Sequence, residues 1–83
     1  MSRSRKTLEK VLGGRADANV RFRELRGLLK SLGFEERIKG DHYIFSRDGM
    51  VEIINLQPKG SLSKPYQVKQ VRELIVRYQL KGD

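Results

Sequence analysis

Apolar residues recur at two kinds of spacing along the chain, and the spacing changes twice. From residue 22 onward they recur every three or four positions, which marks one face of a helix, at Phe22, Leu25, Leu28, Leu29 and Leu32. Gly33 then suits the left-handed position that ends a helix. Arg23, Arg26 and Lys30 lie off the apolar stripe and should face water or a ligand. The pattern predicts an amphipathic helix from Phe22 to Leu32.

The same helical spacing returns near the end of the chain, at Val68, Val71, Leu74, Ile75 and Tyr78. Because proline is favoured in the first turn of a helix, we expect this helix to run from Pro65 to about Gln79, with Gly82 ending it. A shorter helix is predicted from Lys6 to Leu12, stopped by Gly13-Gly14. Residues 1–5 should fray, and residues 15–20 read as a polar connection.

Between the long helices, branched and aromatic residues predict three strands, at residues 34–38, 42–46 and 50–56. Lys39-Gly40 makes a tight turn between the first two. Arg47-Asp48-Gly49 is a hairpin signal, because Asp-Gly tolerates positive φ. Residues 57–64 hold proline, glycine and serine and are expected to form a loop.

The expected order of elements is therefore α-α-β-β-β-α. Strands joined by hairpins form an antiparallel sheet, and its one apolar face can receive the apolar stripes of the helices. The fold class is predicted to be α+β, in two layers, with the helices on one face of a three-stranded sheet. We expect residues 1–19 to be a basic N-terminal extension with a short helix, and residues 20–83 to form the functional domain.

Composition adds a class of partner to this fold. The 83 residues suffice for one domain, and the net charge is +8 with a pI of about 10.2. Lysine and arginine concentrate in residues 1–30 and 57–83, whereas residues 31–56 carry more acidic than basic side chains. A basic balance of this size favours a polyanion, usually nucleic acid. A merely solvated basic surface is the alternative.

Several kinds of chemistry have no support in the sequence. Without cysteine there are no disulfides, thiol catalysis or thiolate metal sites, and one histidine does not make a zinc site. No glycine-rich phosphate loop is present, and Ser61 and Ser63 have no second histidine to activate them. We expect no metal and no cofactor. Because no membrane-length apolar run or signal peptide is visible, we expect a cytoplasmic protein.

His42 is the single histidine and the side chain best suited to act as an acid or a base near neutral pH. It follows a glycine turn and begins a predicted strand. Alternation along that strand puts Tyr43 and Phe45 on one face and His42 on the other. Phe45 is assigned to the core. Tyr43 is a weaker candidate as a platform for stacking a base.

A single histidine is sufficient if the substrate is RNA, because the 2′-hydroxyl of the substrate can be the nucleophile. The protein must then bind the backbone, align the reacting atoms and move protons. DNA lacks this hydroxyl and would not be cleaved. The candidate phosphate contacts are Lys39, Arg47, Lys59 and Lys64. Lys59 and Lys64 flank the predicted loop, and an ordinary solvated loop is an equally good interpretation there.

An ordered set of segments resembles the HicA family, the toxin halves of bacterial toxin–antitoxin modules. The segments are Phe22-Arg23-Glu24-Leu25, Leu32-Gly33-Phe34, Lys39 to Phe45, the Pro-Gly loop, and Pro65 to Val71. The resemblance covers about residues 20–80. The helix at Lys6–Leu12 lies outside the basic family pattern and looks like a subgroup extension.

The resemblance implies a fold like that of a double-stranded-RNA-binding domain and metal-independent cleavage of mRNA. It implies that His42, in the Gly-x-His motif, is catalytic, and that the partner is a HicB-type antitoxin. The family usually has serine between the glycine and the histidine, where this chain has Asp41. A carboxylate there can orient His42 and favour its protonated form, or it can repel the substrate phosphate.

Two other functions remain open from the sequence. The first is an RNA-binding module of the same fold that does not cleave RNA, which predicts salt-sensitive binding. The second is an interaction protein whose basic face exists for an acidic protein partner. Binding and cleavage assays separate these functions from the endoribonuclease.

Overall fold

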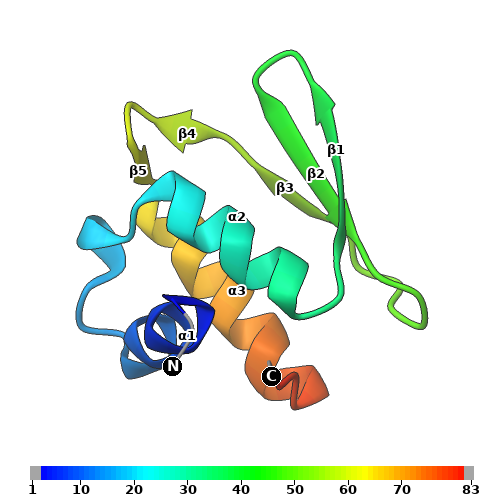
Figure 1. The fold of residues 1–83 in the computed structure, drawn as a ribbon, viewed down its shortest axis with the longest axis horizontal. Coiled ribbons are helices and arrows are strands. Elements are labelled where there is room, and N and C mark those ends of the chain that lie inside the picture. Colours follow the sequence, from blue (N-terminus) through cyan, green and yellow to red (C-terminus); the bar gives the residue numbers. More distant parts are fainter. Residues whose placement is uncertain (1–2, 82–83) are drawn as a thin grey trace.

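The computed structural model describes residues 3–81 and has the expected order of two helices, three strands and a closing helix (Figure 1). The helices are α1 (Arg3–Gly13), α2 (Phe22–Ser31) and α3 (Pro65–Tyr78). The strands of the main sheet are β1 (Glu35–Lys39), β2 (His42–Ser46) and β3 (Ile54–Leu56). A short 3-10 helix, η1 (Asp17–Asn19), and a small hairpin of β4 (Pro58–Lys59) and β5 (Leu62–Ser63) complete the described elements.

The main sheet is antiparallel, with β2 between β1 and β3. Tyr43 pairs with Leu56, and Phe45 pairs with Ile54. Residues directly opposite each other in an antiparallel pair share a face of the sheet. Phe45, Ile54 and Leu56 are fully buried, whereas His42 and Asn55 are exposed. The sheet therefore has one covered face and one open face, as expected for a two-layer α+β domain.

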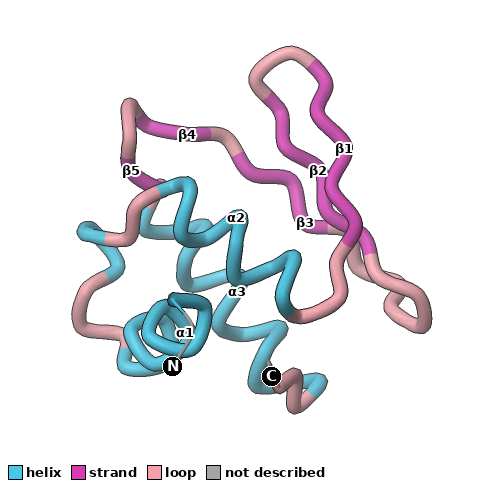
Figure 2. Tube along the Cα trace, in the orientation of Figure 1, coloured by secondary structure: helices cyan, strands magenta, loops and turns pink. Residues whose placement is uncertain are grey.

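The helices lie together on the covered face of the sheet (Figure 2). The stripes of α2 and α3 that were read from the sequence are buried there, apart from the half-exposed Tyr78 at the end of α3. Val11 of α1 is fully buried in the same hydrophobic core. Although the division at residue 19 stays a prediction, α1 is thus a packed part of the fold. It begins at Arg3, so the expected fraying is wrong for residues 3–5, and residues 1–2 lie outside the described part.

The segment after β2 differs from the expectation. Asp48 and Gly49 do form a turn, with Met50 N donating to the carbonyl of Arg47 at 3.1 Å. The expected strand at residues 50–56 is nevertheless wrong in its first half, because β3 begins only at Ile54. Val51 is 92% exposed. Glu52 instead binds Arg77 and the hydroxyl of Tyr78 on α3, which draws this segment away from β2.

Two helix ends and one loop also depart from the expectation. Helix α3 ends at Tyr78, where Gln79 takes the left-handed conformation at φ 52°. The expected terminator, Gly82, lies outside the described residues. Gly33 does occupy the left-handed position after α2, at φ 94°. The expected loop at residues 57–64 contains the β4–β5 hairpin.

Among the described residues, no helix is both long and apolar enough to cross a membrane.

A partly buried ion pair joins α2 to β1. Glu36 accepts two hydrogen bonds from Arg26, at 2.7 and 2.9 Å, and Lys30 lies 3.1 Å from the same carboxylate. The hydrogen bond from Arg26, with a smaller contribution from Lys30, lowers the pKa of Glu36 to about 2. Arg26 also covers the ring of Tyr43 on β2, with its guanidinium carbon 4.7 Å from the ring centroid. One arginine therefore fixes the helix against two strands.

This ion pair predicts a pH dependence of stability. The pKa of Glu36 is about 2 in the folded protein and about 4.5 in the unfolded chain. Its stabilising contribution is therefore complete above about pH 4.5 and lost as the pH falls towards 2. We expect Glu36→Gln to flatten the fall in the free energy of unfolding over this range, as measured by urea denaturation. Glu35→Gln, at the exposed neighbouring position, is the control and should keep the wild-type profile.

Candidate functional site

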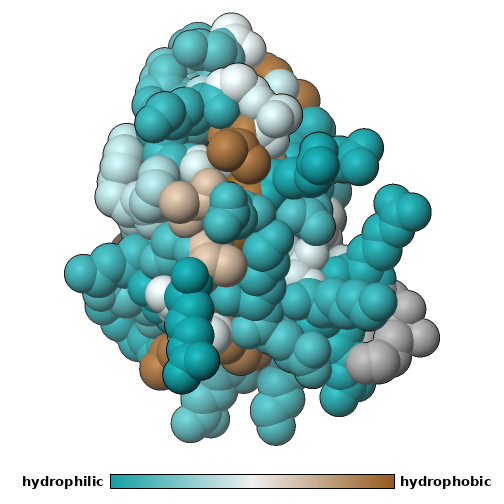
Figure 3. Space-filling view, turned by 90° about the vertical axis from the view of Figure 1, so that its left-hand side faces the viewer, coloured by the Kyte–Doolittle hydropathy of each residue, from teal (hydrophilic) through white to brown (hydrophobic). Residues whose placement is uncertain are grey.

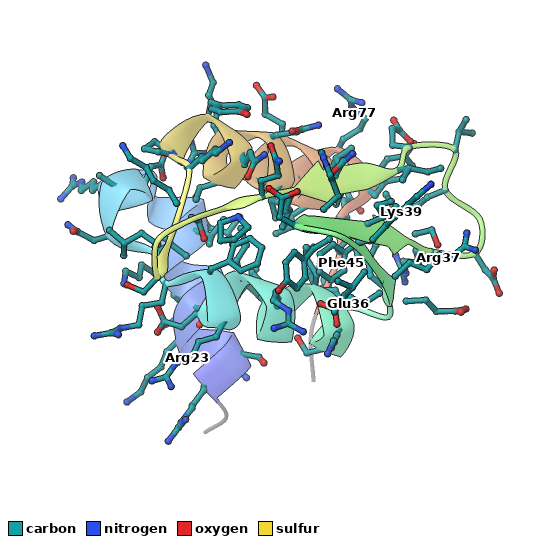
Figure 4. All side chains as sticks on the ribbon, turned by 90° about the horizontal axis from the view of Figure 1, so that it is seen from above. Arg23, Glu36, Arg37, Lys39, Phe45 and Arg77 are labelled. Atoms are coloured by element: carbon teal, nitrogen blue, oxygen red, sulfur yellow. The ribbon has the colours of Figure 1, made fainter. Side chains whose placement is uncertain are left out.

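His42 lies at the start of β2, directly after the tight turn at Gly40, whose φ is 63°. Its strand partner is Lys39, the last residue of β1. Because Tyr43 and Phe45 face the helices, the alternation of the strand turns His42 to the open face. The side chain is 48% exposed. His42, the catalytic candidate predicted from the sequence, is thus accessible to a large substrate. Phe45 lies on the covered face, between the sheet and α2 (Figure 4).

The imidazole is oriented by Asn55 on the neighbouring strand. Nδ1 of His42 lies 3.2 Å from Oδ1 of Asn55. An amide oxygen only accepts hydrogen bonds, so the hydrogen of a neutral imidazole sits on Nδ1. The lone pair is then on Nε2. The contact therefore selects the tautomer in which Nε2 can accept a proton.

Gln57 approaches the imidazole from the end of β3. Its Nε2 atom lies 3.1 Å from Oδ2 of Asp41 and 3.5 Å from Nε2 of His42. Its Oε1 atom accepts a hydrogen bond from Nζ of Lys64 at 3.4 Å. Since an ammonium only donates and a carboxylate only accepts, these two partners fix which way the amide points. The amide N–H groups therefore face Asp41 and His42.

Asp41 is brought to the imidazole, although neighbouring residues on a regular strand point apart. The tight turn places Oδ1 of Asp41 3.7 Å from Nε2 of His42. This is the atom that receives a proton if His42 acts as a base, and a carboxylate at this distance stabilises the charged ring. The turn therefore brings Asp41 close enough to act on the charged form of His42. Asp41 is 73% exposed, so its charge also faces an approaching phosphate.

Gln67 on α3 supports this group from beneath. Only 4% of it is exposed, and its Oε1 atom accepts a hydrogen bond from the backbone N–H of Gln57 at 3.2 Å. Its Nε2 atom donates to the backbone carbonyl of Asn55 at 3.4 Å. One buried amide thus holds the backbone of Asn55 and Gln57, two of the residues that contact the imidazole. Sequence reasoning missed Asn55, Gln57 and Gln67, because nothing in their spacing shows that they meet.

The four predicted cationic contacts are not all near His42. Lys39 is its strand partner, and Lys64 reaches the site through Gln57. Lys39 and Arg37 are labelled on β1 in Figure 4. Arg47 follows the far end of β2, five residues from His42, which is roughly 15 Å at the rise of a strand. Lys59 is exposed in the β4–β5 hairpin. The structure therefore groups Lys39 and Lys64 with His42, and it places Arg47 elsewhere.

Within residues 3–81, no group of three or more His, Cys, Asp or Glu side chains is placed to hold a metal ion. The site is instead a set of proton donors and acceptors with two lysines at its border. Comparisons of the chain with protein-family models, with curated proteins and with solved structures returned no match. The chemistry of the site must therefore be argued from its own residues.

The role of Gln67 can be tested by stability. Gln67→Leu keeps a similar volume but leaves the N–H of Gln57 and the carbonyl of Asn55 without their partner. We expect the free energy of unfolding to fall by about 1–3 kcal/mol. Gln70→Leu, at an exposed position of the same helix, is the matched control and should stay within about 0.5 kcal/mol of wild type. Equal effects of the two substitutions in urea denaturation would contradict the role of Gln67.

Proposed function

We propose that the protein is an endoribonuclease in which His42 is the general base. The observation that carries this proposal is the hydrogen bond between Nδ1 of His42 and Asn55, which leaves the Nε2 lone pair on the open face of the sheet. A base must be correctly oriented and accessible to the substrate. The hydrogen bond to Asn55 and the exposure of the His42 side chain provide both, and the positive net charge suits a polyanionic substrate.

In the proposed reaction, Nε2 of His42 takes the proton from a 2′-hydroxyl of the RNA. The 2′-oxygen forms a bond to the adjacent phosphorus, and the bond from phosphorus to the 5′-oxygen breaks. The products are a 2′,3′-cyclic phosphate and a 5′-hydroxyl. The proton on Nε2 is stabilised by Asp41, 3.7 Å away. Lys39 and Lys64 are the candidate donors for the leaving 5′-oxygen and for contacts to the phosphate.

The resemblance to the HicA family supports an endoribonuclease with a catalytic His42, and it extends the proposal to a role in the cell. The motif residue Gly40 makes the tight turn at positive φ, and His42 emerges from it onto the open face. On this basis we propose that the protein is a toxin that cleaves mRNA in the cytoplasm. Its partner is proposed to be a HicB-type antitoxin that covers His42.

One observation favours a second function, that of an RNA-binding module without cleavage. The exposed carboxylate of Asp41 lies beside the imidazole, where the reacting phosphate would have to sit. A like charge at this point opposes the approach of the phosphate. Such a module would bind RNA in a salt-dependent manner and leave it intact.

The decisive measurement is RNA cleavage by wild type and by His42→Ala. We expect the substitution to lower the rate by about 10²–10⁴-fold, the usual contribution of a positioned proton-transfer group. The variant should remain folded, because His42 is exposed, and its expression should not arrest growth. Undiminished cleavage by His42→Ala would rule out the assignment.

A modified substrate is the control for this experiment. An RNA with a single 2′-deoxy nucleotide at the cleaved position should bind as tightly as the unmodified RNA and stay intact, because the nucleophile is missing. Product analysis should find a 2′,3′-cyclic phosphate. Binding without any cleavage of the unmodified RNA by wild type would favour the binding module.

A further inference from the structure

A pocket of about 330 Å³ opens on the other side of the sheet from His42. It lies between the start of α2 and the β4–β5 hairpin. Its walls include Arg21, Arg23, Arg26, Tyr43, Pro58 and Ser61. The hairpin is tied to α2 because Phe22 N donates to the carbonyl of Ser61 at 2.9 Å. Neither the pocket nor its residues take part in the reaction described above.

The pocket is positively charged. Arg26 is neutralised by Glu36, but Arg21 and Arg23 form no ion pair with any residue between 3 and 81. Glu24 is the nearest acid along the chain. Its carboxylate accepts a hydrogen bond from the backbone N–H of Arg21 and lies 3.8 Å from Nζ of Lys10. Two guanidinium groups are therefore left for an anion. Hydrophilic side chains cover most of the face drawn in Figure 3, with a few apolar residues among them.

The pocket also has a firm apolar wall. The ring of Tyr43 lies edge-on to Phe22, with centroids 4.8 Å apart, and Arg26 covers it at 4.7 Å. These contacts hold the tyrosine in one orientation, and Pro58 of the hairpin lines the same pocket. An apolar wall beside two free guanidinium groups suits a ligand with both a flat apolar part and a phosphate. A nucleotide has both.

The pocket and His42 are back to back at the same end of the sheet. Tyr43, which lines the pocket, directly follows His42 in the sequence. Pro58, which also lines the pocket, directly follows Gln57, which contacts His42. Consecutive strand residues point to opposite faces. A rigid duplex lying on one face would not reach the other. A flexible single strand can pass round the turn at Gly40 and contact both.

We propose that the pocket binds a nucleotide of a single-stranded RNA whose reacting phosphate lies at His42, with Arg21 and Arg23 holding the backbone phosphate. The inference rests on the proposed function and names its substrate class. It assigns Arg21 and Arg23, at the start of α2, to RNA binding. Neither was among the four cationic contacts predicted from the sequence.

The test measures binding in the His42→Ala background, so that the RNA stays intact. Arg21→Ala/Arg23→Ala should weaken binding of a fluorescent single-stranded RNA by about tenfold or more. The slope of log K against log salt should become shallower by about 1.4, for two lost phosphate contacts on a single strand. Arg15→Ala/Lys69→Ala removes the same charge from exposed positions outside the pocket. It should change both the affinity and the salt slope less than the pocket variant does.

A blunt RNA duplex of the same sequence gives the second arm. We expect it to bind more weakly than the single strand and to respond equally to the two double substitutions. If both double variants weaken single-strand binding to the same extent, the pocket is not a binding site and only general electrostatics acts. Preference for the duplex would likewise overturn the proposal.

Failure of this inference can be told apart from failure of the proposed function. With His42 restored, the pocket variant should raise KM for the single strand more than it lowers kcat. If His42→Ala cleaves RNA like wild type, the catalytic assignment fails, while the binding comparison still decides on the pocket. If cleavage depends on His42 but binding ignores Arg21 and Arg23, only the pocket assignment fails.

Discussion

The covered face of the sheet determines where every other part of the molecule can lie. Phe45, Ile54 and Leu56 are buried beneath the helices, and strand geometry then places His42 and Asn55 on the open face. A slip of β2 by one residue would expose Phe45 and bury the imidazole. The packing of the core and the accessibility of His42 therefore depend on the same register.

Helix α3 connects the core to the residues around the imidazole. The apolar face of the helix is buried in the core, and its buried Gln67 holds the backbone of Asn55 and Gln57. Lys64, just before the helix, completes the arrangement by fixing the amide of Gln57. Asn55 and Gln57 thus lie on or directly after the strand paired with β2, and α3 holds their backbone. Their geometry depends on this tertiary packing as well as on the pairing of β2 with β3.

Local pattern was enough to predict much of this fold. The stripes of α2 and α3 and the bounds of β2 follow from periodicity, and Gly33 ends α2 as expected. The sequence could not show that Glu52 pairs with α3, which shortens β3. Nor could it show the amide contacts to His42, because they join residues 13 and 15 positions apart. Arg47 was placed near His42 by closeness in sequence, whereas an extended strand separates them.

Three acidic residues form ion pairs that stabilise this strongly basic chain, and these pairs determine which of its cations stay unpaired. Glu36 joins α2 to β1, Asp17 joins η1 to α3 through Arg72, and Glu52 joins the segment before β3 to α3 through Arg77. Each of these acids is used to hold two elements together. The arginines at the start of α2 are left without an acid, whereas the lysines near His42 share their site with the exposed carboxylate of Asp41. A net charge of +8 attracts any polyanion from a distance, but the proposed contacts with RNA depend on which cations the fold leaves unpaired.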